Sequence, residues 1–450
     1  MSETIRKPWL LVVTIGLGTL LNPLNSSMIS VALTRLQHEF DLTFASVSWL
    51  ISTFYLASAV GQPIMGKLSD MFGPKRMFLA GLIIICLASI LAPFSPNFGW
   101  LIVFRMLQAI GSSTLFPSGM LMIRQSISKN RARALSILSI FSSTSAAFGP
   151  SIGGFLINFG DWPAIFFINF PFIIASFISA IFILPRDGRV KLDLRRIDFI
   201  GIILFIISIV MILLFLLSFE GPIHWWTLAV AVISSLLFYF QEKRPKEPFI
   251  DFKALKTNIN LSFVYLQFIC INLIFYSIFF GMPSFLQQAQ HFSEKSTGVI
   301  MLSIAGFGVI IAPFAGRWID KKGSKPPLLV GALTVIIGTI LLLTIHVASP
   351  VWWMFLVLSI LGISNGFNNI GMQTALYAFA RPEETGSASG LFQTSRYIGT
   401  ILSSVLLALF FNKHMDGAHL HIITIICLIV SVIILLLTIR MPAKKRDTSR

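Results

Sequence analysis

Two turns in this 450-residue chain carry the same charged residues at the same spacing. The first runs from Gly66 to Lys75 and the second from Gly316 to Lys325, and both read G-[KR]-x-x-D-x-x-G-x-K. The second glycine permits the positive φ of a tight connection, the aspartate can cap or pair near a helix end, and the lysine can reach neighbouring carbonyls. Such a turn suits a polar contact that forms in one conformation and breaks in another.

We predict that residues around these turns form a conformational latch. Arg131 or Arg133, in the next basic loop, is the expected partner of Asp70. The alternative for Lys75 and Arg76 is that they only orient their loop. The predicted latch comprises Gly66, Asp70, Gly73, Lys75, Arg76, Arg131, Arg133 and Asp320.

Two arginines lie inside long apolar runs, where a charge is costly. Arg105 falls in the run from about 99 to 124, and Arg396 falls in the run from about 385 to 411. A guanidinium that faced lipid there would cost about 3 kcal/mol. Both side chains are therefore expected to face the protein interior.

The composition indicates that lipid surrounds much of this chain. Hydrophobic residues make up 55% of the chain and charged residues 12%, which is about half the charge of a soluble domain. Water could not solvate so much apolar surface, so the composition excludes a soluble enzyme and indicates an integral membrane protein. All three cysteines fall inside apolar runs, so neither a disulfide framework nor a CxxC metal signature is expected.

Fourteen apolar runs are long enough to cross a bilayer core of about 30 Å as helices. They lie near residues 8–30, 45–66, 76–95, 99–124, 134–156, 163–184, 197–218, 223–241, 260–282, 296–317, 327–347, 351–378, 385–411 and 420–440. With both termini in the cytoplasm, 29 of the 34 Lys and Arg residues lie in inner segments and only three lie outside. This bias predicts a multi-pass protein of the cytoplasmic membrane. It also excludes nucleic-acid binding as the explanation of the net charge of +16, because the basic residues are spread over many short loops.

The repeated turn predicts the domain organisation of an all-α membrane protein. The two copies are 250 residues apart, so the first six spans recur as the last six and two spans are inserted between them. We predict an N-terminal six-helix bundle over residues 1–190, two inserted helices with linkers over 191–256, and a C-terminal bundle with a basic tail over 257–450. Parallel repeats of this kind are typical of transporters in which two bundles rock about a site between them.

Three motifs resemble the signature set of the major facilitator superfamily. They are the G-x-L-x-D-x-x-G-x-[KR]-[KR] turn from Gly66, the pair Arg105 and Gln108, and the run from Gly149 to Gly154 (GPSIGG). The fourteen predicted spans and the segment DWPAIFFINFP from Asp161 resemble the fourteen-helix drug:proton antiporter branch, which includes multidrug, quaternary-ammonium and tetracycline exporters.

The resemblance implies the superfamily fold of two six-helix bundles and the export of amphipathic drugs in exchange for protons. It gives Arg105 a role in proton movement. It also identifies an exporter motif, whose small residues would let helices of the two halves pack closely: Gly149, Pro150, Gly153 and Gly154. No cofactor is expected, because the chain has no nucleotide-binding P-loop and a proton gradient would supply the energy.

The chain departs from this branch at the acid in the first span, where it has Asn25, which cannot titrate. None of the 18 acidic residues lies near the centre of a predicted span. If protons are coupled to transport, the carrier is expected among Glu220, Asp41 and Asp161 near predicted outer ends, or it is a histidine.

Amide and aromatic side chains in the spans suggest a path for amphipathic organic molecules, because such sites combine apolar walls with a few polar groups. Without a central carboxylate, neutral, zwitterionic or monocationic compounds are expected rather than dications. The chain is expected to act as a monomer with small molecules, protons and lipid as its partners. Its predicted substrate-binding residues are Asn25, Tyr55, Phe116, Phe148, Tyr276, Asn368, Asn369 and Arg396.

Three other functions compete with drug export. A proton-independent facilitator or importer of a small metabolite is favoured by Asn25 and disfavoured by the run Gly149 to Gly154. A membrane-embedded enzyme would need convergent catalytic groups, and the sequence has no HExxH or GxSxG motif. A receptor-like sensor would have no use for the long repeat.

Overall fold

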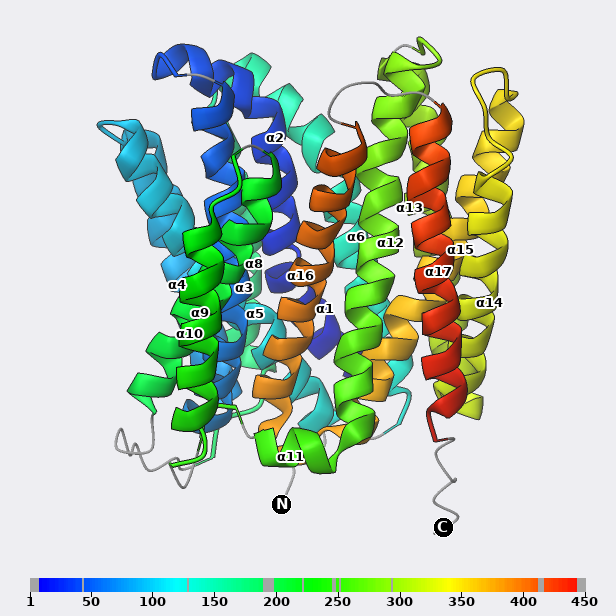
Figure 1. The fold of residues 1–450 in the computed structure, drawn as a ribbon. Coiled ribbons are helices and arrows are strands. Elements are labelled where there is room, and N and C mark those ends of the chain that lie inside the picture. Colours follow the sequence, from blue (N-terminus) through cyan, green and yellow to red (C-terminus); the bar gives the residue numbers. More distant parts are fainter. Residues whose placement is uncertain are drawn as a thin grey trace. The chain divides into compact units, whose positions relative to one another are not determined.

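The structure is a computed structural model that describes residues 8–42, 44–127, 129–188, 198–220, 222–244, 248–250, 252–292, 294–411 and 417–442. All regular secondary structure in these ranges is helical (Figure 1). Contacts between residues divide the chain into two compact units. Unit 1 comprises Met1–Ile197 and Ala380–Thr394, and unit 2 comprises Asp198–Phe379 and Ser395–Arg450. The domain boundaries predicted at residues 190 and 256 stay predictions.

Unit 1 is built from the first eight α-helices and the beginning of α16. The helices are α1 (Pro8–Thr19), α2 (Leu21–Glu39), α3 (Phe44–Phe72), α4 (Pro74–Leu91), α5 (Phe98–Ser126), α6 (Arg131–Gly160), α7 (Ala164–Phe167), α8 (Asn169–Ile183) and the first residues of α16 (Thr385–Phe411). The segment that follows α6 anchors one end of this unit. Trp162 and Phe166 are buried there in a hydrophobic cluster with residues of α2, α3 and α5.

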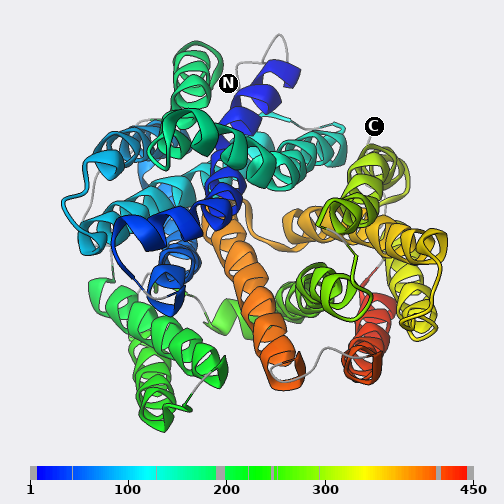
Figure 2. The ribbon, with the colours of Figure 1, turned by 90° about the horizontal axis from the view of Figure 1, so that it is seen from above.

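Unit 2 contains the remaining helices. They are α9 (Phe199–Leu217), α10 (Trp225–Gln241), α11 (Phe252–Thr257), α12 (Ile259–Gln288), α13 (Glu294–Lys322), α14 (Lys325–Leu342), α15 (Val351–Phe379), the rest of α16 and α17 (Gly417–Arg440). Helices α9 and α10, which correspond to the predicted insertion, pack side by side as a pair (Figure 2).

The two units repeat the same local structure, as the duplicated turn predicts. In unit 1, α5 packs against α3 and α4, and α8 packs against α1 and α4. In unit 2, α15 packs in the same way against α13 and α14, and α17 packs against α12 and α14. Positive φ angles recur 250 residues apart, at Gly73 (95°) and Gly323 (80°) and again at Asp41 (49°) and His291 (57°).

Ten helices in the described part of the chain are long and apolar enough to cross a membrane. Four predicted spans fall on helices outside this group, namely α3, α6, α10 and α16. Helix α10 is only 17 residues long, and the other three are rich in Ser, Thr and Gly. Large apolar side chains remain exposed on several of the ten, and Phe182 on α8 is 81% exposed. Lipid would cover such side chains without the free-energy cost that water imposes.

The connection between α3 and α4 shows why its glycine is needed. Asp187, which follows α8, accepts hydrogen bonds from the backbone N–H of Lys75 (3.0 Å) and of Arg76 (2.9 Å) and so caps α4. A Cβ on Gly73 would lie 2.5 Å from the Asp187 carboxyl carbon. Gly73 therefore supplies both the positive φ and the space for this cap.

Lys75 in unit 1 and its counterpart Lys325 in unit 2 each bind backbone carbonyls at the end of a helix. The ammonium of Lys75 donates to the carbonyls of Ile181 (2.7 Å) and Leu184 (2.9 Å) at the end of α8. The ammonium of Lys325 donates to the carbonyl of Ile439 (2.8 Å) at the end of α17. Each lysine satisfies helix-terminal carbonyls and complements the negative end of the helix dipole.

A Gly73→Ala substitution is expected to lower the melting temperature of the purified protein more than Gly323→Ala does. Both substitutions place a side chain at positive φ, which costs about 1–2 kcal/mol. Only Gly73→Ala also meets Asp187, because nothing lies within 4 Å of a Cβ built on Gly323. The overlap should add about 1–3 kcal/mol. Equal melting temperatures for the two variants would show that the Asp187 cap does not constrain this turn.

Candidate functional site

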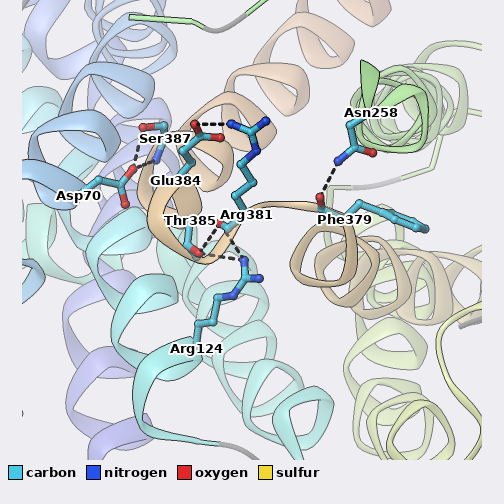
Figure 3. Close-up of polar contacts among 8 residues, drawn as sticks. All are labelled: Asp70, Arg124, Asn258, Phe379, Arg381, Glu384, Thr385 and Ser387. Atoms are coloured by element: carbon cyan, nitrogen blue, oxygen red, sulfur yellow. Dashed lines mark hydrogen bonds and ion pairs between the residues drawn. The ribbon is translucent and has the colours of Figure 1, made fainter. Parts of the chain in front are cut away.

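The carboxylate of Asp70 binds the amino-terminal end of α16 (Figure 3). It accepts hydrogen bonds from the backbone N–H of Gly386 (2.7 Å) and of Ser387 (2.8 Å), and from the Ser387 hydroxyl (2.7 Å). The first N–H groups of a helix have no partner within the helix, and the helix dipole places partial positive charge there. Asp70 therefore caps α16 from a helix that lies more than 300 residues earlier in the chain.

Arg124 binds backbone carbonyls in the segment that leads into α16 (Figure 3). Its guanidinium donates to the carbonyls of Ala380 (2.8 Å) and Arg381 (3.3 Å), which follow α15, and to the Thr385 hydroxyl (2.9 Å). In unit 1 the carboxylate thus meets N–H groups and the guanidinium meets carbonyls. In unit 2, Asn258 donates to the carbonyl of Phe379 at the end of α15 (2.7 Å).

Glycines allow α3 and α16 to touch through their backbones. A Cβ on Gly66 would lie 2.2 Å from the Gly386 carbonyl oxygen, and a Cβ on Gly390 would lie 2.3 Å from the Gln62 carbonyl oxygen. Larger residues at these positions would push the helices apart and lengthen the bonds to Asp70.

The predicted latch residues divide into three groups in the structure. Gly66 and Asp70 contact α16. Gly73, Lys75 and Arg76 organise the α3–α4 turn against α8 and Asp187. Arg131 donates to the carbonyls of Ile127 and Arg124 rather than to Asp70, while Arg133 and Asp320 are exposed at helix ends. The hydrogen bonds described for Asp70 thus come from α16, where sequence reasoning expected Arg131 or Arg133.

The contact changes the acidity of Asp70, which lies beyond the predicted span of residues 45–66. Burial raises the pKa of its carboxyl to about 6, although the hydrogen bonds from Ser387 and Gly386 act in the opposite direction. Removal from water disfavours the charged form, whereas donated hydrogen bonds favour it. The carboxyl therefore binds a proton more readily in this contact than it would in water.

Arg105 is held in a buried polar network inside unit 1. The residue is 1% exposed, and its guanidinium donates to the Gln108 side-chain oxygen (2.6 Å) and to the Asn25 carbonyl (3.3 Å). The guanidinium carbon also lies 4.4 Å from the centre of the Phe54 ring. The prediction that Arg105 faces the protein interior is in agreement with this position.

Neutral side chains complete this network. Asn25 and Asn169 exchange two side-chain hydrogen bonds of 2.9 Å, so each amide satisfies the other. Gln108 donates to the Asn25 side-chain oxygen (3.0 Å) and to the Ser89 hydroxyl (3.1 Å). Sequence reasoning missed Asn169 and Ser89. Asn169 stands within the DWPAIFFINFP segment, and Ser89 has no sequence signal that separates it from ordinary helix packing.

The predicted exporter motif packs α6 against α2 within unit 1. A Cβ on Gly149 would lie 1.8 Å from the Ser27 hydroxyl oxygen, and a Cβ on Gly153 would lie 3.1 Å from the Met28 carbonyl oxygen. Gly154 has more room, since its Cβ would be 3.7 Å from Val31. The expectation that these glycines pack one half against the other is not met by these contacts, which join two helices of the same unit. The side chain of Pro150 lies outside the described part of the chain.

The acids proposed as proton carriers occupy different surroundings. Asp161 pairs with Arg35 through contacts of 2.8 and 2.6 Å. This guanidinium holds the pKa of Asp161 below its ordinary value, which makes the carboxyl a poor proton carrier near neutral pH. Asp41 is exposed at a positive φ of 49°, and the side chain of Glu220 lies outside the described part of the chain.

The predicted substrate-binding residues are distributed over both units. In unit 1, Asn25 belongs to the buried network, Tyr55 and Phe116 are half-buried, and Phe148 is exposed. In unit 2, Asn368 is 1% exposed and borders a small cavity between α12, α13, α14, α15 and α17. Asn369 accepts a hydrogen bond from Gln373 (2.5 Å), and Tyr276 and Arg396 are half-buried on α12 and α16.

Residues 15–404 match the sequence profile of the Major Facilitator Superfamily. The chain belongs to this superfamily. It is therefore a multi-pass transporter of small molecules in a lipid bilayer rather than an enzyme, and its helices form the all-α fold of these transporters.

Curated relatives within the superfamily differ in what they are named to transport. The chain is 44% identical to the uncharacterized MFS-type transporter YwoD of Bacillus subtilis (strain 168), over 96% of each chain. It is 25% identical to the riboflavin transporter RibZ of Clostridioides difficile (strain 630), covering 91% of this chain and 89% of RibZ. It is 28% identical to the multidrug transporter protein MdtP of Bacillus subtilis (strain 168), covering 90% of this chain and 76% of MdtP.

A Gly149→Ala substitution is expected to disturb the α2–α6 contact, whereas Gly154→Ala serves as its matched control. The new methyl group at Gly149 overlaps Ser27, but the one at Gly154 makes an ordinary contact with Val31. Overpacking of this kind costs about 1–3 kcal/mol. Thermal unfolding of the two purified variants should therefore show a lower melting temperature for Gly149→Ala alone, and a wild-type value for Gly149→Ala would refute the close contact.

Proposed function

We propose that this chain is a secondary active transporter that exports amphipathic drugs in exchange for protons by alternating access. The observation that carries the proposal is the double contact in which Asp70 binds the start of α16 and Arg124 binds the carbonyls of Ala380 and Arg381, which follow α15. Export by alternating access needs contacts that differ between two states. A carboxylate and a guanidinium bound to the backbone in this way provide such contacts, because both groups regain water when the helices separate.

Fourteen membrane spans are part of this proposal. Ten described helices meet the length and hydropathy required of a span. Helices α3, α6, α10 and α16 coincide with the other four predicted spans. Transmembrane helices that pack mainly against other helices use Ser, Thr and Gly more often, which is the composition of α3, α6 and α16. An even number of spans places both termini on the same side of the membrane. The excess of Lys and Arg in the loops on that side indicates that it is the cytoplasmic side.

A proton gradient is the energy source that we propose. A proton that moves inward releases about 2.3 kcal/mol per 100 mV of membrane potential and about 1.4 kcal/mol per pH unit. Exchange for an outgoing drug can therefore concentrate the drug outside. The named function of the multidrug relative MdtP supports drugs as the cargo, and the GPSIGG run supports export as the direction.

The second candidate is a proton-independent facilitator or importer of a metabolite. It is favoured by the buried network around Asn25, in which the side chains that pair with Asn25 and Arg105 are neutral. The riboflavin transporter among the relatives also has a metabolite in its name. In this case the chain would move its substrate down a gradient without moving protons.

Proton release in everted membrane vesicles separates the two candidates. Respiration acidifies the vesicle interior, a pH-gradient dye reports it, and ethidium, a fluoroquinolone and tetracycline are added in turn. Antiport predicts dye dequenching that requires this protein and follows addition of a drug. Drug movement down its gradient without dequenching would replace antiport by facilitation.

An Asp70→Asn substitution is expected to abolish drug-dependent proton release while the protein still inserts into the membrane. The amide keeps the shape of the side chain but lacks the charge that binds the N–H groups of α16, and a charged acceptor makes the stronger hydrogen bond. Glu384→Gln is the matched control, since it also changes a carboxylate to an amide near the start of α16 but only breaks an exposed pair with Arg381. Wild-type activity of Asp70→Asn, at equal amounts of protein in the membrane, would refute the latch role of Asp70.

A further inference from the structure

Charged residues within the predicted spans are of one sign. Arg105 and Arg396 lie inside spans, whereas none of the 18 acids lies near the centre of one. Intramembrane charges are costly and usually face a partner, a cavity or a substrate path. The interior of the spans therefore carries an excess of positive charge, which favours anions and disfavours cations.

Arg105 contributes to this charge without being open to a ligand. Its guanidinium is buried, and its hydrogen bonds go to the neutral groups of Gln108 and Asn25. The dipoles of these amide groups stabilise the guanidinium cation but do not cancel its charge. Arg105 is thus a fixed source of positive potential in unit 1.

Arg396 occupies a more accessible position in unit 2. It is half-buried on α16, one turn before Gly399, where α16 closely approaches α12. A Cβ on Gly399 would lie 2.6 Å from the Ile269 carbonyl oxygen and 2.8 Å from the Cβ of Asn272. The missing side chain of Gly399 therefore brings Arg396 to the face of α12 that carries Tyr276.

The guanidinium of Arg396 contacts one phenol group and interacts with a second. It donates to the Tyr397 hydroxyl at 3.4 Å, and its central carbon lies 5.2 Å from the centre of the Tyr397 ring. Tyr276 interacts electrostatically with both Arg396 and Tyr397 and shares a hydrogen bond with Thr400. A planar cation with adjacent O–H donors matches the two oxygens of a carboxylate.

Aromatic rings continue along α12 beside this cluster. Phe275 and Phe279 are stacked with their centres 5.5 Å apart, and Tyr276 and Phe280 are 5.3 Å apart. Phe275, Tyr276 and Phe279 are half-buried and Phe280 is exposed. Ring faces of this kind pack well against a flat organic molecule.

We propose that the transported molecules are aromatic carboxylates, and that Arg396, with the hydroxyls of Tyr397 and Tyr276, binds the carboxylate while the rings of α12 contact the aromatic body. The inference rests on the proposed function and names its substrate class. It places the anion-binding group in unit 2.

A matched pair of probes tests this site directly. Norfloxacin carries a free carboxylate, and its ethyl ester has the same aromatic body without that charge. Binding of each compound to the purified full-length protein is measured by equilibrium dialysis. Wild-type protein should bind the acid about tenfold or more tightly than the ester, since hydrogen bonds to a charged group are stronger than those to a neutral one.

Variants assign the preference to Arg396. Arg396→Gln should bind acid and ester equally, and Arg396→Lys should keep part of the preference because it retains the charge without the planar fork. Tyr397→Phe should weaken binding of the acid several-fold and leave binding of the ester unchanged. If Arg396→Gln elutes as an aggregate, the Tyr397→Phe variant tests the proposed site in its place. Equal binding of acid and ester by the wild type, or an unchanged preference in Arg396→Gln, would overturn the proposal.

The vesicle assay keeps this inference separate from the proposed antiport. Selective binding of the acid without drug-dependent proton release would support the site and refute antiport. Ethidium-dependent proton release together with equal binding of acid and ester would support antiport and refute the site.

Discussion

The binding of the α16 amino terminus by Asp70 ties the start of that helix to the rest of unit 1. Helix ends near a membrane cannot leave their N–H and C=O groups unsatisfied, because each such group costs several kcal/mol in a low-dielectric environment. Asp70 satisfies N–H groups at the start of α16, Arg124 satisfies the carbonyls of Ala380 and Arg381 just before it, and the glycines of α3 and α16 give the backbones the necessary proximity. A single short segment, residues 380–387, is therefore fixed by two opposite charges.

The buried network around Arg105 follows the same physical rule with different groups. A guanidinium in a span needs acceptors, and amide oxygens supply them here without adding a second charge. An amide cannot exchange protons as a carboxylate does, so Asn25 contributes hydrogen bonds to the network but no titratable site. Asn25, Asn169, Gln108 and Ser89 are neutral, so Arg105 is the charged member of the network described here, and its role in proton movement stays a prediction.

Sequence reasoning predicted the all-helical fold, the internal repeat, the positive φ at Gly73 and the inward position of Arg105. These features depend on local composition and on spacing, which a single sequence carries. It did not predict that Asp70 binds α16, because backbone N–H groups have no signature in the sequence and α16 is more than 300 residues away. The cap that Asp187 forms on α4 was missed for the same reason, since only the folded chain brings the end of α8 to that turn.

Because Asp70 and Arg124 bind mainly the backbone, the contact does not depend on the identity of most side chains in residues 380–387. Substitutions there can accumulate without loss of the bonds, provided that Gly386 stays small and no proline replaces a donating N–H. The constraint falls instead on Asp70, Arg124 and Gly66 in the first half of the chain. Divergence between related transporters is therefore expected to be asymmetric, with one partner of the contact held fixed while the other changes in sequence.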